Sequence, residues 1–480
     1  MIALDLRNPQ TGRPRAQGHP AQAIAGGLLI ATTILVICHE WSGLAVFALP
    51  AAITTFGAIA LLALRVAWSR RLYLLIGVAL FAVVVAVLPG WRDAAAAAFG
   101  TASFIAAFFT ALMTIRSVAA SSPSIQACGM FLAQQPPGRR YLALTIGGHL
   151  FGLILSYGAI SLLGSLAASS VAKEPDPEIR AHRKRRMLVA IQRGFVSTLP
   201  WSPLAFAVAI STTLVPGASW SGAVLPCLVS ALILSGTGWA LDTIFKPRLT
   251  VPRPAARAEG GWLKAMAPLL VLLAILLSCV TAIWAVADLR IIAAVMSVVP
   301  IIALVWAGIQ GQGEEGALRH IGNRAAAFAV RDLPGNGPEL VLLVMAGFIG
   351  TIGGQLAAAV VPGTGFDLAA LPTWSVLLIL FWLIPVAGQI GMNPILAVSL
   401  MAPLLPTPEA LGVAPSTVIV AITGGWALSG STSPFTASTL LIGSLGGVSA
   451  THVGLRWNSV YALTCGFVLS LWVLLLAILS

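Results

Sequence analysis

Charged residues are scarce in this chain of 480 residues. Only 9% of the residues are Asp, Glu, Lys or Arg, whereas 58% are hydrophobic. A soluble globular protein needs more polar surface than this composition supplies, so a soluble fold is excluded. Apolar runs of the length that a helix needs to cross about 30 Å of hydrocarbon recur along the chain, and the ten-residue alternation of an outer-membrane barrel does not. The sequence therefore predicts an all-α polytopic membrane protein.

Several functional signals are missing as well. The five cysteines are odd in number and lack metal-ligand spacing, which predicts buried thiols. No GxxxxGK[ST] loop occurs, so ATP hydrolysis through a P-loop is not expected. The net charge of +12 fits the topology-determining Lys and Arg of a membrane protein, and nucleic-acid binding is not predicted. The first apolar run has no small-residue cleavage site after it, so we expect no cleaved signal peptide.

Hydropathy predicts about eleven transmembrane helices plus two re-entrant hairpins, with the N-terminus inside and the C-terminus outside. Both flanks of the first hairpin are basic, and neither flank of the second carries Lys or Arg, so each hairpin returns to the side from which it enters. In this topology, all Lys and Arg residues except Arg92 and Arg290 lie on the inside. Two very short full helices are the alternative interpretation of the first hairpin. The crossings are expected at 22–39, 43–66, 72–90, 94–115, 194–215, 220–241, 264–286, 290–309, 339–361, 417–441 and 459–479, and the hairpins at 141–170 and 375–406.

The predicted elements form two halves of opposite orientation. Three helices, a hairpin and two further helices occur twice in this order, and such inverted-topology repeats are the usual plan of secondary transporters. The predicted division is a cytoplasmic N-terminal segment at 1–21, an extra first helix at 22–42, repeat 1 at 43–241 (helices 2–4, hairpin 141–170, helices 5–6), a cytoplasmic linker at 242–263, and repeat 2 at 264–480 (helices 7–9, hairpin 375–406, helices 10–11).

Each half contains a predicted helix that proline interrupts among small hydroxyl residues. Residues 197–217 read STLPWSPLAFAVAISTTLVPG and residues 429–447 read SGSTSPFTASTLLIGSLGG, and each segment follows a predicted hairpin. Proline removes a backbone donor and frees carbonyl groups of the preceding turn. Within a bilayer these carbonyl groups need other partners, either an ion or substrate or the neighbouring Ser and Thr hydroxyl groups. The occurrence of a break after both hairpins favours the ion or substrate.

These segments resemble the ion transporter superfamily, and within it the divalent anion/sodium symporters. The stretch GMNPILAVSLMAPLLP at 391–406 looks like the tip and return arm of that family's second hairpin, STSPFTASTLLIGSLGG at 431–447 like its broken helix, and GLRWNSVYALTCGFVLSL at 454–471 like its closing helix. In the first half, STLPWSPLAFAVAIS at 197–211 looks like the other broken helix, and 147–152 like the inner hairpin tip.

This resemblance implies elevator-type alternating access by a secondary transporter, most often of an anion, and a homodimer. The Ser-Asn-Thr signature of the dicarboxylate symporters is absent from both tips. Gly-Gly-His at 147–149 and Gly-Met-Asn at 391–393 replace it. Dicarboxylate specificity is therefore not implied.

No Lys, Arg, Asp or Glu lies in the hairpins or the two breaks. An anion would be held by helix N-terminal amides, hydroxyl groups and amide side chains, and a sodium ion by freed carbonyl and hydroxyl groups. His149, the one ionisable group at a predicted tip, either carries a proton or is a neutral histidine bonded within the hairpin. The predicted substrate-binding residues are Gly148, His149, Trp201, Ser202, Asn393, Thr432 and Ser433, and the predicted ion-binding residues are Gly147, Thr198, Gly391, Ser429 and Ser431.

The sequence therefore predicts an ion-coupled secondary transporter of a small anion, an organic acid in particular, in a bacterial-type inner membrane. Sodium or a proton is the expected coupling ion, no cofactor is expected, and the predicted partners are the anion, the coupling ion, the lipid bilayer and a second copy of the chain. An enzyme is not predicted, because intramembrane clusters of ionisable residues are missing. The alternatives are a membrane subunit of a multicomponent transport system and, less favoured, a membrane-embedded enzyme.

Overall fold

The computed structural model describes residues 20–136, 139–172, 174–245, 261–287, 289–311, 316–364 and 368–480. These residues form helices and connecting turns, and no strand occurs among them. The all-α class predicted from composition is therefore confirmed. Nearly all of the predicted N-terminal segment and most of the predicted linker at 242–263 lie outside the described residues.

Nine helices of the described ranges are long and apolar enough to cross a membrane, as expected for a multi-pass membrane protein. Their bounds agree with nine of the predicted crossings to within a few residues. The count of eleven crossings, the re-entrant hairpins and the orientation remain predictions. The nine are α1 (Pro20–Ser42), α2 (Ala48–Ala63) with the short η1 (Ala45–Phe47) before it, α3 (Trp68–Val87), α4 (Trp91–Ala120), α10 (Trp220–Ile244), α11 (Trp262–Ala287), α12 (Ile291–Gln310), α15 (Gly337–Val360) and α21 (Ser459–Leu479).

The two remaining predicted crossings are interrupted helices, as their prolines indicate. The first consists of α8 (Pro177–Val196) and α9 (Phe206–Leu214), which residues 197–205 separate. The second consists of α18 (Pro415–Thr432) and α19 (Ala437–Gly446), which residues 433–436 separate. We call the two separating segments the first break and the second break.

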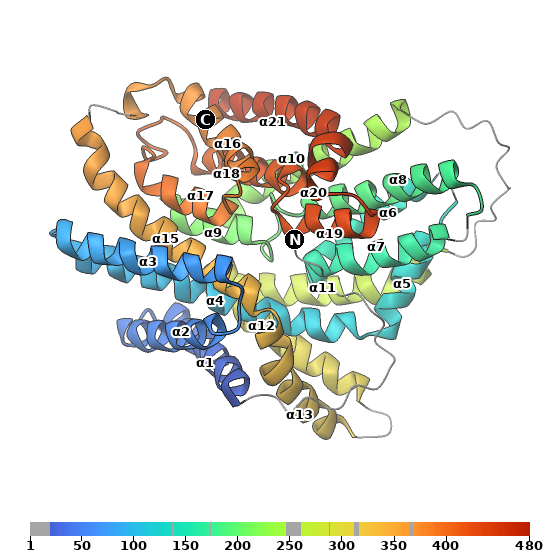
Figure 1. Cartoon of the computed structure of the whole chain (residues 1–480), viewed down its shortest axis with the longest axis horizontal. Helices are drawn as coiled ribbons and strands as arrows, with labels where there is room; N and C mark the ends of the chain where they lie inside the picture. The colour runs from blue at the N-terminus through green and yellow to red at the C-terminus, as the bar shows by residue number, and fades with distance from the viewer. Residues whose placement is uncertain are drawn as a thin grey trace.

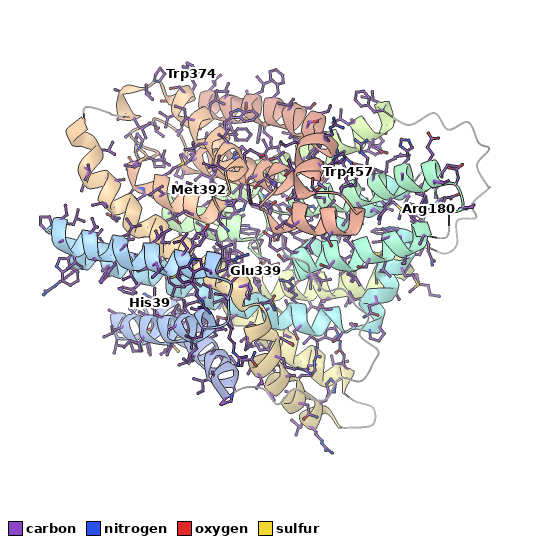
Figure 2. The ribbon with its side chains drawn as sticks, in the orientation of Figure 1. His39, Arg180, Glu339, Trp374, Met392 and Trp457 are labelled. Atoms are coloured by element: carbon purple, nitrogen blue, oxygen red, sulfur yellow. The ribbon has the colours of Figure 1, made fainter. Side chains whose placement is uncertain are left out.

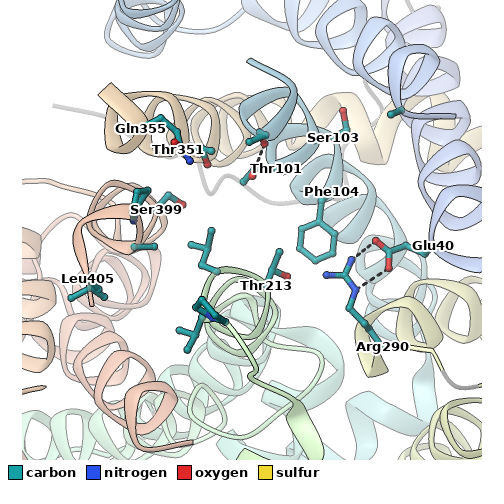
Figure 3. A pocket seen from close by; sticks show the side chains of 18 of the residues that line it. Glu40, Thr101, Ser103, Phe104, Thr213, Arg290, Thr351, Gln355, Ser399 and Leu405 are labelled. Carbon is teal, nitrogen blue, oxygen red and sulfur yellow. Dashed lines mark hydrogen bonds and ion pairs between the residues drawn. The ribbon is translucent and has the colours of Figure 1, made fainter. Parts of the chain in front are cut away.

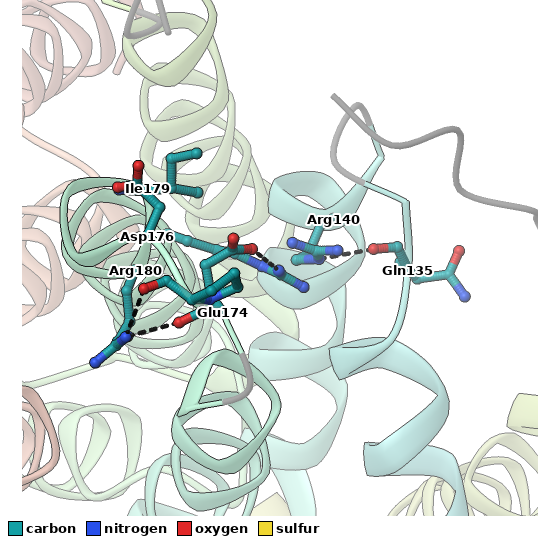
Figure 4. Close-up of polar contacts among 8 residues, drawn as sticks. Gln135, Arg140, Glu174, Asp176, Ile179 and Arg180 are labelled. Carbon is teal, nitrogen blue, oxygen red and sulfur yellow. Dashed lines mark hydrogen bonds and ion pairs between the residues drawn. The ribbon is translucent and has the colours of Figure 1, made fainter. Parts of the chain in front are cut away.

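Helix α8 begins well before the predicted crossing at 194–215. Asp176 caps it by accepting hydrogen bonds from the backbone amides of Glu178 and Ile179, at 2.8 and 3.0 Å, and Pro177 occupies the first helical position. Both features stabilise a helix start. Arg180 donates to the Glu174 backbone oxygen at 2.8 Å beside this cap (Figure 4). Most of the basic stretch between the first predicted hairpin and the predicted crossing at 194–215 is therefore helical.

Pairs of short helices stand where the hairpins are predicted. The first pair is α6 (Arg140–Leu155) and α7 (Tyr157–Ala172), and the second is α16 (Thr373–Gln389) and α17 (Pro394–Met401). In Figure 1 the two pairs lie on opposite sides of the molecule. The second pair turns at residues 390–393, in agreement with the tip predicted at Gly391–Pro394.

The tip of the first pair lies elsewhere than predicted. Helix α6 runs unbroken through Gly147, Gly148 and His149, and the chain turns at Ser156, whose φ is 49°. The prediction of a bend at 147–149 is therefore wrong. A Cβ atom on Gly148 would lie 2.5 Å from the carbonyl oxygen of Ile191 in α8, so this glycine permits close packing of two helices and does not bend one.

The same packing occurs in both halves. The first helix of each pair lies against the part of the broken helix that precedes the break, α6 against α8 and α16 against α18. A Cβ atom on Gly194 would lie 2.1 Å from the Thr145 carbonyl oxygen, and one on Gly425 would lie 2.3 Å from that of Phe381. Only glycine allows backbones to approach this closely.

A second group of helices packs around α4 and α15, which contact the short helices α6 and α17. Helices α1, α2, α12 and α15 pack on α4, and α3 packs on α15. The rings of Phe56, Phe99 and Phe348 meet at centroid distances of 5.0 to 5.2 Å and join α2, α4 and α15. Figure 1 shows α1–α4, α12 and α13 below the broken helices. The other elements are α5 (Pro123–Ala133), α13 (Ala317–Ala327), η2 (Phe328–Asp332), α14 (Leu333–Gly335), η3 (Val361–Thr364), η4 (Leu368–Ala370), η5 (Ala402–Leu404), α20 (Ala450–His452) and η6 (Val453–Trp457).

Candidate functional site

A cavity of about 240 Å³ lies where both breaks and both short-helix tips meet. Met392, at the second tip, and Glu339, in the first turn of α15, both line it and are labelled in Figure 2. We call this space the central cavity. The segments that the sequence singled out therefore come together. The first tip contributes Gly152, Ser156 and Tyr157, the first break and its flanks Phe195, Thr198, Leu199, Ser202 and Leu204–Ala207, the second tip Gly391–Ile395, and the second break with its flanks Trp426, Gly430, Ser433, Phe435–Ser438 and Leu440.

One wall of the central cavity was not predicted. Arg70 and Tyr73 from the start of α3 line it, together with Glu339 from the first turn of α15. Arg70 donates to the Pro338 backbone oxygen at 3.0 Å, which ties the two helix starts together. The Glu339 carboxylate forms no direct hydrogen bond or ion pair with a described residue, but the positive charges of Arg116 and Arg70 lie close enough to act on it. Arg70 and Glu339 are far apart in the sequence, and the packing of α3 and α15 brings them to the same cavity.

The predicted site residues divide into two groups. Thr198, Ser202, Gly391, Asn393 and Ser433 line the central cavity. The other predicted residues do not line it, but pack in the helices and turns around it: Gly147, Gly148, His149, Trp201, Ser429, Ser431 and Thr432. Their predicted roles in binding remain predictions.

Two cavity side chains have donors available for a ligand. The Asn393 side-chain oxygen caps α17 by accepting from the Ile395 amide at 2.8 Å, so the side-chain amide nitrogen is left to donate. The Ser202 hydroxyl oxygen accepts from the Leu204 amide at 3.2 Å, and its proton has no acceptor among the described residues. The cavity can therefore offer hydrogen bonds to an anion or a carbonyl group.

His149 and Trp201 hold the first break in place. His149 Nδ1 lies 2.7 Å from the Ser197 hydroxyl, and Trp201 Nε1 donates to His149 Nε2 at 3.3 Å. Because the Ser197 hydroxyl itself donates to the Gly194 carbonyl oxygen at 2.7 Å, we assign the proton to Nδ1. Both nitrogens of a neutral imidazole are then satisfied. This arrangement matches the alternative interpretation of His149 as a neutral histidine.

The carbonyl groups freed by the second break have protein partners. The Ser438 hydroxyl donates to the Gly430 carbonyl oxygen, and the Thr436 hydroxyl donates to that of Ser433 at 2.9 Å. Hydroxyl groups of the segment itself thus satisfy these oxygens, as the second interpretation of the prolines expects. The Ser429 hydroxyl, by contrast, is buried and has no partner in the described structure.

A buried polar cluster joins the two broken helices. Asn458, at the start of α21, donates from its side-chain amide to the Gln192 side-chain oxygen at 2.9 Å and to the Ser431 carbonyl oxygen at 3.2 Å. Arg193 Nε donates to the Asn458 side-chain oxygen at 3.1 Å. Gln192 and Arg193 belong to α8 and Ser431 to α18. The sequence did not predict this cluster, although Arg193 stands next to the predicted crossing at 194–215, within an apolar run that was a signal of burial.

Solved structures are similar to this chain over most of its length, whereas no family model and no curated protein matches the sequence. The YdaH transporter of Alcanivorax borkumensis, a structure with an unusual topology, has a TM-score of 0.53 and 15% identity, and the match covers 85% of this chain and 98% of YdaH. This chain has the fold of a membrane transporter. MtrF of Neisseria gonorrhoeae, from a class of antimetabolite efflux pumps, has a TM-score of 0.53 and 14% identity over 87% of this chain and 97% of MtrF.

The names of these neighbours describe a transporter and an efflux pump. Identities of 14 and 15% relate the folds alone. The resemblance to the divalent anion/sodium symporters remains a prediction.

Proposed function

We propose that the protein is an ion-coupled secondary transporter of a small organic anion, and that the central cavity is its substrate site. The observation that carries this proposal is the convergence of both breaks and both short-helix tips on one cavity. Transporters built from inverted repeats bind substrate between discontinuous helices at the interface of the repeats. The fold shared with YdaH and MtrF supports the same class.

The cavity lining favours an organic acid as the substrate. The Arg70 guanidinium group can hold a carboxylate, and Ser202 and Asn393 can donate further hydrogen bonds to it. Phe206 and Phe435 offer apolar surface to a hydrocarbon body. A few polar groups within a largely apolar lining are typical of small-molecule sites.

Each candidate coupling ion has a group that can bind it. Hydroxyl groups such as those of Thr198 and Ser202 suit sodium, and the Glu339 carboxylate suits a proton. A substrate carboxylate on Arg70 would repel the negative charge of Glu339, so substrate binding would favour proton uptake there. Anion and proton would then cross together.

The movement, assembly and location of the protein belong to the same proposal. The short-helix pairs and broken helices would move as one unit against the support formed by α1–α4, α12 and α15, in an elevator-type exchange of access. We further propose that the protein is a homodimer in a bacterial-type inner membrane and that it is related to the divalent anion/sodium symporters. The apolar helices and the fold shared with transporters support the location in a membrane.

Transport by the purified protein in proteoliposomes tests the function. Carboxylates, oxyanions and sugar acids are offered under an imposed sodium or proton gradient. We expect one gradient to drive uptake of an organic acid, and the Arg70→Gln variant to lose that uptake. Glu339→Gln should abolish driving by a proton gradient while exchange of the acid persists. Arg65→Gln, which changes a charge outside the cavity lining, is the control.

The proposal fails under one combination of results. It is wrong if neither gradient drives uptake or exchange of any acid and if substitutions of Ser202 and Asn393, whose donors are free in the cavity, leave the biological activity of the protein intact.

A further inference from the structure

A second cavity, of about 540 Å³, lies at the far ends of two short helices that border the central cavity. Helix α9 lines the central cavity with Phe206 and the second cavity with Leu214, and α17 does so with Pro394 and Ser399. The nine residues of α9 span about 13 Å. We call this second space the distal cavity (Figure 3). The same two helices therefore connect the two cavities.

Two hydroxyl groups in the distal cavity are buried without partners. Thr351 on α15 is 5% exposed and Ser399 on α17 is 0% exposed. Neither hydroxyl has a hydrogen-bond partner in the described structure, and both residues line the distal cavity. Figure 3 shows them on neighbouring helices beside Gln355. Burial of an unpaired hydroxyl is unfavourable, so groups of this kind usually bind a ligand or water.

Thr101 also lines the distal cavity, but its hydroxyl group has a hydrogen-bond partner. The Thr101 hydroxyl donates to the Ala97 carbonyl oxygen at 2.9 Å, within its own helix. Its hydrogen-bonding proton is therefore in use. Thr101 and Thr351 are residues of the same type and line the same cavity. Of the two, only Thr351 has a hydroxyl group free to bind a ligand.

The charged residues of the distal cavity present a positive group. Arg290, directly before α12, forms a two-pronged ion pair with Glu40 of α1, through Nε and Nη2 (Figure 3). The Arg290 side chain is 53% exposed and that of Glu40 only 12%. Arg290 Nη1 makes no hydrogen bond to a described residue. The guanidinium group therefore faces the space and retains donors that suit a carboxylate.

We propose that the distal cavity is a second binding site for the transported organic anion. Thr351 and Ser399 donate hydrogen bonds to the anion, and Arg290 supplies the attracting charge. The anion passes between the central and distal cavities along α9 and α17. This inference rests on the proposed transport function, but its first test needs no transport.

The first test compares two thiol reagents of opposite charge on the Ser399→Cys variant. The probes are the anionic (2-sulfonatoethyl) and the cationic (2-trimethylammonioethyl) methanethiosulfonates, with rates normalised to those of 2-mercaptoethanol. Peptide mass spectrometry separates position 399 from the five native cysteines. We expect the anionic reagent to react severalfold faster, and Arg290→Gln to remove this preference.

Equal rates for the two reagents, a preference for the cationic one, or no reaction at all would overturn the site. The Thr351→Cys variant repeats the measurement at the second hydroxyl position, in case Ser399→Cys does not fold. Because no transported substrate is needed, a negative result here leaves the proposed function open, and an inactive transporter leaves this result valid.

The second test measures the KM of the acid that the gradient assay identifies, from each face of the membrane, in vesicles of opposite orientation. Thr351→Val should raise KM about fivefold at one face only, the factor of one ordinary hydrogen bond. Thr101→Val, which has the same change of shape, should leave KM unaltered. If Thr351→Val leaves KM unaltered at both faces and only raises the melting temperature, the hydroxyl is a structural defect and the inference is wrong.

Discussion

The two breaks occupy equivalent places but are held by different groups. Side chains of other helices hold the first break: Trp201 donates to His149 of α6, and its carbonyl oxygen accepts from Trp220 of α10 at 2.9 Å. The second break is closed mainly by hydroxyl groups from the break and from the first turn of α19, such as those of Thr436 and Ser438. A proline break therefore does not in itself create an ion site. Whether a break can bind an ion depends on whether its freed carbonyl groups already have hydrogen-bond partners in the protein.

The largest expected effect is a loss of stability that should be equal in the two halves. Gly194→Ala and Gly425→Ala each place a methyl group within 2.3 Å of a backbone carbonyl oxygen. We expect each to cost about 3 kcal/mol or more of stability, since neither backbone can yield easily. The melting temperature of the purified protein measures this loss. Gly236→Ala, whose Cβ would meet nothing within 4 Å, is the control and should be neutral. Unequal losses at 194 and 425 would contradict the equivalence of the halves.

The next largest effect is the loss of stability when the buried polar cluster that joins the two broken helices is removed. Asn458→Ala leaves Arg193, the Gln192 oxygen and the Ser431 carbonyl without a shared partner. Because all of these groups are buried, we expect a loss of about 3 kcal/mol in stability. A chemical or thermal unfolding curve measures it. Ser459→Ala, at the adjacent position, should change little. An unaltered unfolding curve for Asn458→Ala would show that the link carries no stability.

A smaller effect distinguishes a serine that binds substrate, Ser202, from one that stabilises the structure, Ser433. The Ser433 hydroxyl donates to the Gly388 carbonyl oxygen at 2.6 Å, whereas the Ser202 proton is free. Ser433→Ala should therefore lower stability by about 1 kcal/mol and alter KM little. Ser202→Ala should raise KM about fivefold, and because it also removes the acceptor of the buried Leu204 amide, it should lower stability by about 1 kcal/mol as well, so that KM separates the two serines. Transport kinetics and melting curves of both variants check this. The opposite pattern would reverse the assignment of the two serines.

The smallest effect concerns His149. A glutamine side chain can both donate to Ser197 and accept from Trp201, as the neutral imidazole does. His149→Gln should therefore retain transport, and the pH dependence of the transport rate should not change. His149→Phe, which keeps the ring but removes both hydrogen bonds, should be less stable. A pH profile that changes in His149→Gln would show instead that the histidine carries a proton.

The sequence reveals those features that depend on local chemistry. Both breaks and the second tip follow from proline, glycine and hydroxyl residues within a few positions of one another. The first tip has no such signal, because it turns at Ser156, while Gly147 and Gly148 serve close packing. The charged wall depends on how α3 and α15 meet, and no local pattern shows that Arg70 and Glu339 face the same cavity.

The central claim is that both breaks line one substrate site. Protection from alkylation tests it most directly: Ser202→Cys and Ser433→Cys are treated separately with N-ethylmaleimide, at increasing concentrations of the transported acid. One shared site predicts that the acid slows both reactions with the same half-maximal concentration, while Gly236→Cys, outside the cavity, is not protected. Protection of only one serine position, or of neither, would contradict the claim.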